Sequence, residues 1–181
     1  MKTSTASTID LIILGILLDR PMNAYELACL IDEKQVGRFL KISTPAIYKS
    51  CKRLHKSGFL DARTAKEAEN PRKTIYNVNK RGKERFFALM EHFSSNITPF
   101  FLDFNAFLWN IERAGKRRGL RMLERLHGEL SNLNAWIIEH EKEQEMNLSF
   151  PAKAIVKQYR MTIATLLKWC EETVEDYKQT P

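Results

Sequence analysis

The spacing of apolar residues in the first third of the chain predicts three consecutive helices. Apolar residues dominate the first of them, which we place at about 8–18 and interpret as buried. Asn23 is a suitable N-cap for a second helix over 24–33, where apolar residues recur every three or four positions. After a connector at 36–40, a third helix is expected over 44–57.

Both ends of the third helix carry recognisable signals. Ser43 or Thr44 can cap the N-terminus through its hydroxyl, and Pro45 suits the first helical position, where no amide hydrogen is needed. Gly58 suits the left-handed conformation that ends many helices. A single apolar stripe predicts one buried face, and it consists of Ile47, Cys51 and Leu54.

Two short alternating segments follow and predict a β-hairpin. They cover 59–64 and 72–78, and a polar, turn-like segment joins them. Asn79 can then cap a further helix over 80–93. The order of helix, helix, basic helix and hairpin is typical of a winged helix-turn-helix, in which the third helix enters the major groove of DNA.

Longer amphipathic segments replace these short ones in the second half. Aromatic residues cluster over 100–109 and are expected on one helix, and leucines then recur over 123–137 at alternating spacings of three and four. A last helix repeats this spacing over 155–177. The sequence therefore predicts a mostly α fold with a small β-hairpin, divided into an N-terminal winged helix-turn-helix domain, 1–93, and a C-terminal helical dimerisation domain, 94–181.

The two apolar seams of the second half leave two interpretations open. Each helix could bury its seam inside one chain, or the seams could be shared with a second copy. Two long amphipathic helices and an aromatic helix have more apolar surface than so short a segment covers by itself, which favours a homodimer. The predicted dimer interface consists of Leu123, Leu126, Leu130, Leu133, Ile137, Ile163, Leu166, Trp169 and Cys170.

Charge is distributed unevenly along a chain whose formal net charge is +7. Residues 1–90 contain 17 basic and 9 acidic side chains, whereas residues 91–181 contain 12 and 13. The stretch from Lys34 to Leu60 has seven basic residues and no acidic one. Like charges one helical turn apart repel, which favours an anionic partner. The asymmetry predicts a basic module for nucleic acid, DNA in particular, joined to a neutral module.

Other chemistry is thinly represented. The three cysteines, Cys29, Cys51 and Cys170, are far apart and are expected to be reduced and buried. The four histidines have no ligand-like spacing, and no nucleotide-binding or nucleophile motif occurs. We therefore expect no metal, no cofactor and no enzymatic activity. The N-terminal apolar run is too short to cross a bilayer and lacks the flanks of a signal peptide, so a cytoplasmic protein without membrane contact is expected.

As a set, these residues resemble the PadR-type transcriptional regulators. The resemblance covers about 9–90 and rests on segments 13–17, 20–27, 37–43, 47–48, 52–54, 58–60 and 71–73, with Tyr76 and Gly82. The second half is similar to the longer PadR subgroup at 107–108 and 169–172. The resemblance implies a dimer formed through C-terminal helices, repression as the usual activity, and frequent response to small aromatic molecules.

Several positions depart from the family pattern. Asn23 and Ala24 stand where His-Gly is common, Lys49 replaces a common Pro, Cys51 a common Leu and His55 a common acid, and 69–71 replaces Gly-Arg-Pro. Lys49 and His55 add positive charge, which favours DNA binding. The altered tip of the hairpin argues against insertion into the minor groove.

DNA-contacting residues are expected on three elements. Helix N-termini face base edges, so the expected base contacts are Thr44, Ala46, Tyr48, Lys49 and Ser50. The expected phosphate contacts, which fix the register of the protein on DNA, are Lys52, Arg53 and Lys56. The β-hairpin, which is the wing of the motif, adds Arg72 and Lys73. Tyr25 and Ser43 complete the predicted interface. Tyr48 and Tyr76 have the competing interpretation of core residues.

The sequence thus predicts a sequence-specific regulator that binds double-stranded DNA at a palindromic operator, acting as a homodimeric repressor. A small aromatic molecule would relieve repression by binding between the modules, in a pocket lined by Phe104, Phe107, Leu108 and Trp109; the competing interpretation of these four is dimer core. The alternative function is a protein-interaction adaptor whose basic helix is only a surface. An enzyme acting on nucleic acid is disfavoured, because no acidic metal cluster is evident.

Overall fold

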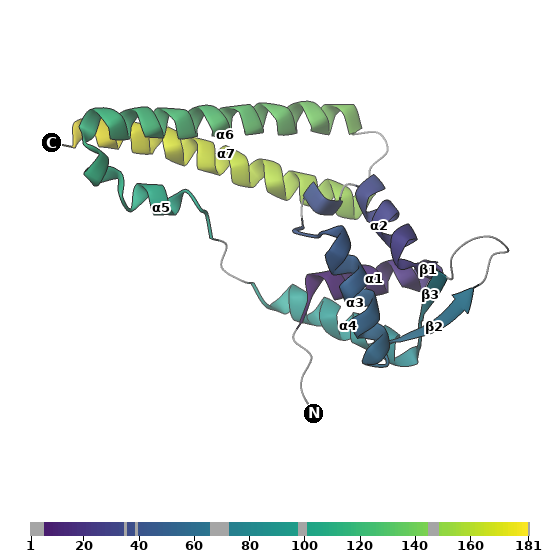
Figure 1. Ribbon diagram of the computed structural model, residues 1–181. Helices are drawn as coiled ribbons and strands as arrows, with labels where there is room; N and C mark the ends of the chain where they lie inside the picture. Colours follow the sequence, from purple (N-terminus) through teal and green to yellow (C-terminus); the bar gives the residue numbers. More distant parts are fainter. Residues whose placement is uncertain are drawn as a thin grey trace. The chain divides into compact units, whose positions relative to one another are not determined.

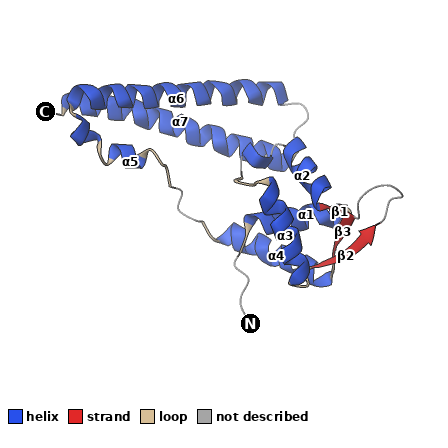
Figure 2. Cartoon of the chain, in the orientation of Figure 1, coloured by secondary structure: helices blue, strands red, loops and turns tan. Residues whose placement is uncertain are grey.

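The computed structural model of the protein describes residues 6–34, 36–38, 40–65, 73–97, 101–144 and 149–180. The chain divides into two compact units, Met1–Pro99 and Phe100–Pro181 (Figure 1). Helices make up most of both units, and the strands belong to the first (Figure 2). The predicted fold class, mostly helical with a small antiparallel sheet, is confirmed.

The first unit follows the predicted order of elements, with one addition. Its elements are α1 (Thr8–Asp19), β1 (Met22–Asn23), α2 (Ala24–Glu33), a 3-10 turn (Val36–Arg38), α3 (Thr44–Lys56), β2 (Leu60–Ala65), β3 (Lys73–Val78) and α4 (Lys80–Ser95). The strand β1 was not predicted, because two residues in extended conformation leave no periodic signal. The sheet order is β1-β3-β2, with both pairs antiparallel.

Asn23 begins α2 as predicted. Its side-chain oxygen accepts hydrogen bonds from the amides of Tyr25 and Glu26 at 2.9 and 3.0 Å, and the carboxylate of Glu26 accepts from the Asn23 amide at 2.9 Å. This reciprocal capping box satisfies amides that the first turn of a helix leaves without partners. It fixes the angle at which the chain enters α2.

The third helix, α3, ends as the sequence predicts but begins differently. Ser43 is its N-cap residue, yet the Ser43 side chain makes no capping hydrogen bond. At the other end, Gly58 has a φ of +76° and its amide donates to the His55 carbonyl, while the amide of Phe59 donates to the Leu54 carbonyl. This Schellman motif terminates the helix and turns the chain directly into β2.

The core of the first unit lies where α1, α2 and α3 meet the sheet. Its completely or almost completely buried apolar side chains are Ile13, Leu14, Leu17, Leu27, Ile47, Cys51, Leu54, Leu60 and Leu89. Tyr76 belongs to this core with 6% exposure, whereas Tyr48 is 39% exposed, so the two competing interpretations resolve differently for the two tyrosines. One charged residue, Asp10, is also fully buried.

The second unit is built on a long helical hairpin. It contains α5 (Asn105–Leu108), a 3-10 turn (Ile111–Ala114), α6 (Lys116–Gln144) and α7 (Phe150–Gln179), and the two long helices run side by side (Figure 1). The expected aromatic helix over 100–109 is wrong in extent, since α5 is a single turn. None of the helices in the described ranges is both long enough and apolar enough to span a membrane.

Most of the predicted dimer seam is core within one chain. Leu123, Leu130, Ile137, Ile163 and Cys170 are at most 7% exposed, because α6 and α7 bury them against each other. The prediction that these five form a dimer interface is therefore corrected. The other four members, Leu126, Leu133, Leu166 and Trp169, lie at the margin of the seam and retain some exposure.

Candidate nucleic-acid interface

The outer face of α3 carries a set of exposed lysines. Lys49, Lys52 and Lys56 all point away from the core, and none of them has a hydrogen bond or ion pair within the described part of the chain. The first residues of the helix, Ser43 and Thr44, are also exposed, and Ala46 is partly so. The helix therefore presents free ammonium groups and its N-terminal turn on one side.

Two predicted contacts of α3 have other partners. Ser50 is only 5% exposed, so its side chain is not available to base edges and that prediction is corrected. Arg53 donates two hydrogen bonds to the buried carboxylate of Asp10, from Nη1 to Oδ2 at 2.8 Å and from Nη2 to Oδ1 at 2.5 Å. Nη2 also lies 3.3 Å from the Ser50 hydroxyl. Arg53 is thus not the freely solvated side chain that the sequence suggested.

Aromatic side chains extend this surface from α3 onto α2. Tyr25 is 67% exposed and Tyr48 is 39% exposed. A hydrogen bond with the Cys29 thiol, the largest cause, raises the pKa of Tyr25, and the nearby Tyr48 adds to the shift. Cys29 was expected to be buried, and this expectation is wrong because its thiol lies at the surface beside Tyr25.

The other α3 cysteine is a core group. Cys51 is fully buried, and loss of solvent raises the pKa of its thiol to about 12, with a further contribution from the charge of Asp10. His55, on the last turn of the same helix, has its Nδ1 2.8 Å from the Leu60 carbonyl. If Nδ1 carries the proton it donates to that carbonyl, which links the end of α3 to the start of β2.

The described part of the wing, the β-hairpin that follows α3, consists of its two strands, β2 and β3. Lys73 is exposed at the start of β3, opposite Ala65 in the register of the β2–β3 pair. Gly82, at the start of α4, packs so close to the sheet that a Cβ there would lie 2.1 Å from the Phe59 carbonyl oxygen. Arg72 and the tip 69–71 lie outside the described residues, so the predictions for them stay predictions.

The four residues proposed for an effector pocket differ in their exposure and contacts. Phe104 stacks on Trp169, with ring centroids 5.6 Å apart and an interplanar angle of 19°. Trp109 is 84% exposed, and Phe107 and Leu108 are partly buried on α5. The aromatic stack joins the segment before α5 to α7.

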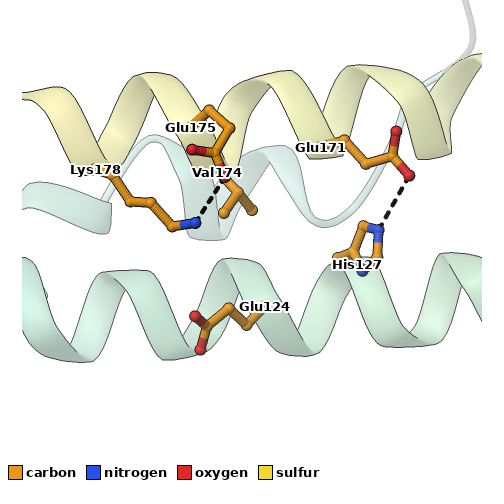
Figure 3. Close-up of a pocket in the computed structure, with 6 residues that line it drawn as sticks. All are labelled: Glu124, His127, Glu171, Val174, Glu175 and Lys178. Atoms are coloured by element: carbon orange, nitrogen blue, oxygen red, sulfur yellow. Dashed lines mark hydrogen bonds and ion pairs between the residues drawn. The ribbon is translucent and has the colours of Figure 1, made fainter.

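A groove of about 270 Å³ lies along one side of the α6–α7 hairpin (Figure 3). Its lining is almost entirely charged and consists of Glu124, His127, Glu171, Val174, Glu175 and Lys178. Nε2 of His127 lies 3.4 Å from Oε1 of Glu171, and Nζ of Lys178 lies 2.6 Å from Oε1 of Glu175. Within the described ranges, no group of three potential ligands could hold a metal ion.

Exposed apolar side chains gather on the opposite side of the same hairpin. Met122, Leu133 and Trp136 recur at helical spacing on α6 with exposures of 38, 37 and 43%, and Ile155 and Tyr159 flank the buried seam of α7 with 41 and 37%. Because the helices are antiparallel and share one buried seam, the two stripes fall on the same side. Sequence reasoning selected the buried seam and overlooked this second stripe, although its helical spacing was visible.

The fold and this surface define a winged helix-turn-helix unit with a basic third helix, followed by a helical hairpin unit. Residues 13–88 match the family model described as the transcriptional regulator PadR-like family. The resemblance inferred from the sequence is confirmed over this segment. A search of curated protein sequences finds no match.

Solved structures share the fold over nearly the whole chain. The PadR protein of Bacillus subtilis in complex with operator DNA is 16% identical with a TM-score of 0.74, covering 94% of this chain and 99% of that one. The same protein with p-coumaric acid is 15% identical with a TM-score of 0.76, covering 96% and 100%. The virulence activator AphA of Vibrio cholerae is 18% identical with a TM-score of 0.67, covering 94% and 98%.

Proposed function

We propose that this protein is a transcriptional regulator that binds double-stranded DNA through α3, and that it acts as a homodimeric repressor. The observation that carries the proposal is the one-sided exposure of Lys49, Lys52 and Lys56 on the third helix of a winged helix-turn-helix. In this motif the third helix lies in the major groove, where free ammonium groups meet phosphates and helix N-termini face bases. The fold shared with a protein solved in complex with operator DNA supports binding to DNA.

The homodimer is supported by the apolar stripes of the second unit. Met122, Leu133 and Trp136 on α6 lie on the same side as Ile155 and Tyr159 on α7, and each of the five is 37–43% exposed. Monomeric proteins rarely leave such a surface in water, and a second copy would cover it. A dimer with two-fold symmetry would read a palindromic operator with its two α3 helices.

A small aromatic effector is the second part of the proposal. The fold shared with a regulator solved with p-coumaric acid supports it, as does the stack of Phe104 on Trp169 within the second unit. Titration of planar aromatic acids, p-coumaric acid included, should quench tryptophan fluorescence saturably and release bound DNA. A broad panel without saturable quenching would remove the effector from the proposal and leave DNA binding intact.

The DNA-binding proposal is tested by fluorescence anisotropy with the protein's own promoter and with a shuffled duplex of the same composition. We expect tighter binding to the promoter, with an affinity that falls steeply as salt rises, because each phosphate contact releases counterions. Equal, weak binding to both duplexes would place the operator elsewhere. Absence of binding to either duplex at low salt would overturn the proposal.

The competing function is a protein-interaction adaptor built on the same fold. It is favoured only by the exposed aromatic side chains, which could contact a protein as well as DNA. The two functions differ in their salt dependence, because an adaptor would have no phosphate-dependent term. The adaptor would be favoured if the protein bound a protein partner and did not bind DNA even at low salt.

A further inference from the structure

The contact between Asp10 and Arg53 joins the first turn of α1 to the C-terminal half of α3. The Asp10 side chain is 1% exposed and the Arg53 side chain 41% exposed, so the pair runs from the core to the surface. Both carboxylate oxygens are engaged, each by one terminal nitrogen of the guanidinium. This fork geometry fixes the plane of the guanidinium as well as its position.

Stability alone is a weak explanation for this pair. Removing a carboxylate from water is costly, and apolar side chains of similar size would often stabilise a core as well as a buried ion pair does. The distinctive effect of the pair is geometric, since it orders a long side chain at the surface of the proposed DNA-binding helix. The entropy of ordering Arg53 is then lost when the protein folds, not when DNA binds.

The donors of Arg53 are only partly used. A guanidinium has five N–H donors. Nη1 and Nη2 each donate one to Asp10, and Nη2 directs its second at Ser50. This leaves one N–H of Nη1 and the N–H of Nε, which lie on opposite edges of the planar guanidinium, so an external acceptor meets one of them. Lys49 and Lys56 lie four positions before and three positions after Arg53, so the three cations form one row along α3. An acceptor that meets this row is a backbone phosphate.

We propose that Asp10 is a positioning residue for DNA binding, which holds the guanidinium of Arg53 so that one of its remaining donors meets a backbone phosphate. The inference rests on the proposed function above and deepens it. It revises the role of Arg53 from a flexible phosphate contact to an oriented one. It also gives Asp10, a buried residue on α1 that would not itself contact DNA, a role in DNA binding.

The negative charge of Asp10 makes the inference testable. Asp10→Asn removes a negative charge near the DNA, so long-range electrostatics alone would strengthen binding. Positioning predicts the opposite result, roughly tenfold weaker binding to the promoter, because the oriented charge-assisted contact is lost. Asp19→Asn is the matched control, since Asp19 lies at the exposed end of the same helix and its replacement changes net charge equally. It should bind as well as the wild-type protein or slightly better.

The experiment measures promoter affinity over a salt series for the full chain carrying Asp10→Asn, Arg53→Gln, both together, or Asp19→Asn. Thermal unfolding of each variant confirms that the titrated sample is folded. We expect the two single variants to lose similar affinity and the double variant to lose no more than Arg53→Gln alone. Arg53→Gln should also reduce the slope of log affinity against log salt by about one, which a purely structural defect would not do.

Arg53→Lys provides a second readout if Asp10→Asn fails to fold. Lysine keeps the charge and a single contact with Asp10 but lacks the fork, so affinity should fall roughly tenfold while the salt slope stays unchanged. Wild-type affinity in Arg53→Lys, or in a folded Asp10→Asn, would overturn the positioning role while leaving the proposed function standing. If the wild-type protein binds no DNA, the proposed function fails, and the inference fails with it.

Discussion

The two units bury their apolar side chains through different arrangements of helices. In the first, helices α1, α2 and α3 pack against a small sheet and bury side chains such as Leu14 and Leu27 completely, while Phe87 and Met90 on α4 remain 55 and 49% exposed. In the second, two long helices share one thin seam, and residues such as Trp136 remain 43% exposed beside it. A layered arrangement surrounds its core, whereas a two-helix hairpin covers only one face of each helix. The first unit therefore has a core enclosed by several elements, whereas the core of the second is a single seam with exposed apolar residues beside it.

The charges of the two units differ in the same sense. On α3 the exposed lysines have no acidic partner among the described residues, whereas the groove of the hairpin pairs Lys178 with Glu175 and His127 with Glu171. Unpaired charge of one sign suits an external anion, and paired charge suits a solvated surface. The comparison supports the proposal that the first unit binds DNA and the second joins two copies.

The largest expected effect comes from breaking the proposed contact between copies. Replacing Leu133 and Trp136 by Glu places charge on the exposed apolar stripe of α6, so we expect monomers in sedimentation velocity and about 100-fold or greater loss of promoter affinity, because linked half-sites bind far more tightly than one. Glu124→Gln with Glu171→Gln, on the opposite side of the hairpin, is the matched control. An unchanged dimer in the Glu variant would show that another surface joins the copies.

A cavity in the first unit should have the next largest effect. Leu14→Ala removes a fully buried side chain from α1 and should lower the free energy of unfolding by about 2–5 kcal/mol. The loss should be independent of protein concentration, since this core needs no partner. Leu18→Ala, at a position on the same helix that is 38% exposed, should cost less than about 1 kcal/mol. Denaturant titration at two protein concentrations measures both.

A single cation of the wing should have a smaller effect. Lys73→Ala should weaken binding to promoter and shuffled DNA alike, and should flatten the salt slope by about one unit, because a phosphate contact fixes register without reading sequence. Lys168→Ala, in an exposed ion pair of the second unit, is the control and should change neither quantity. A salt slope that stays at the wild-type value would remove Lys73 from the interface.

The smallest effect concerns the thiols. Cys29 should react with a thiol reagent in the native protein, whereas Cys51 and Cys170 should react only after unfolding, because both are fully buried. Burial raises the pKa of the Cys51 thiol from its ordinary value of about 9 to about 12. Its contribution to stability is therefore complete below about pH 9 and decreases as the pH rises towards 12. Rapid native labelling of all three thiols would contradict the burial of Cys51 on α3 and of Cys170 on α7.

Local signals explain why much of the first unit was predictable. Asn23, Pro45 and Gly58 mark helix ends through backbone geometry that depends on neighbouring residues alone. The strand β1 was missed because a two-residue strand depends on its partner β3 and not on its own sequence. Cys29 was assigned to the core because an apolar position on a short helix does not reveal how far the buried face extends.

Tertiary contacts account for what sequence reasoning missed in the candidate site. Asp10 and Arg53 are 43 positions apart, and no periodicity within α1 or α3 relates them. Ser50, in contrast, lies at helical spacing with the buried Ile47, Cys51 and Leu54, so its burial was visible in the sequence. In the second unit, the heptad spacing correctly located a buried seam, but spacing alone could not tell whether the opposing helix belongs to the same chain.

The most direct test of this account is the mass of the complex with a short duplex carrying one palindrome from the promoter, measured by sedimentation. The account predicts two chains for each duplex, bound cooperatively, with the two halves of the palindrome protected equally from cleavage. One chain for each duplex would contradict the role of the second unit. Absence of a complex on every promoter duplex at low salt would contradict the role of α3.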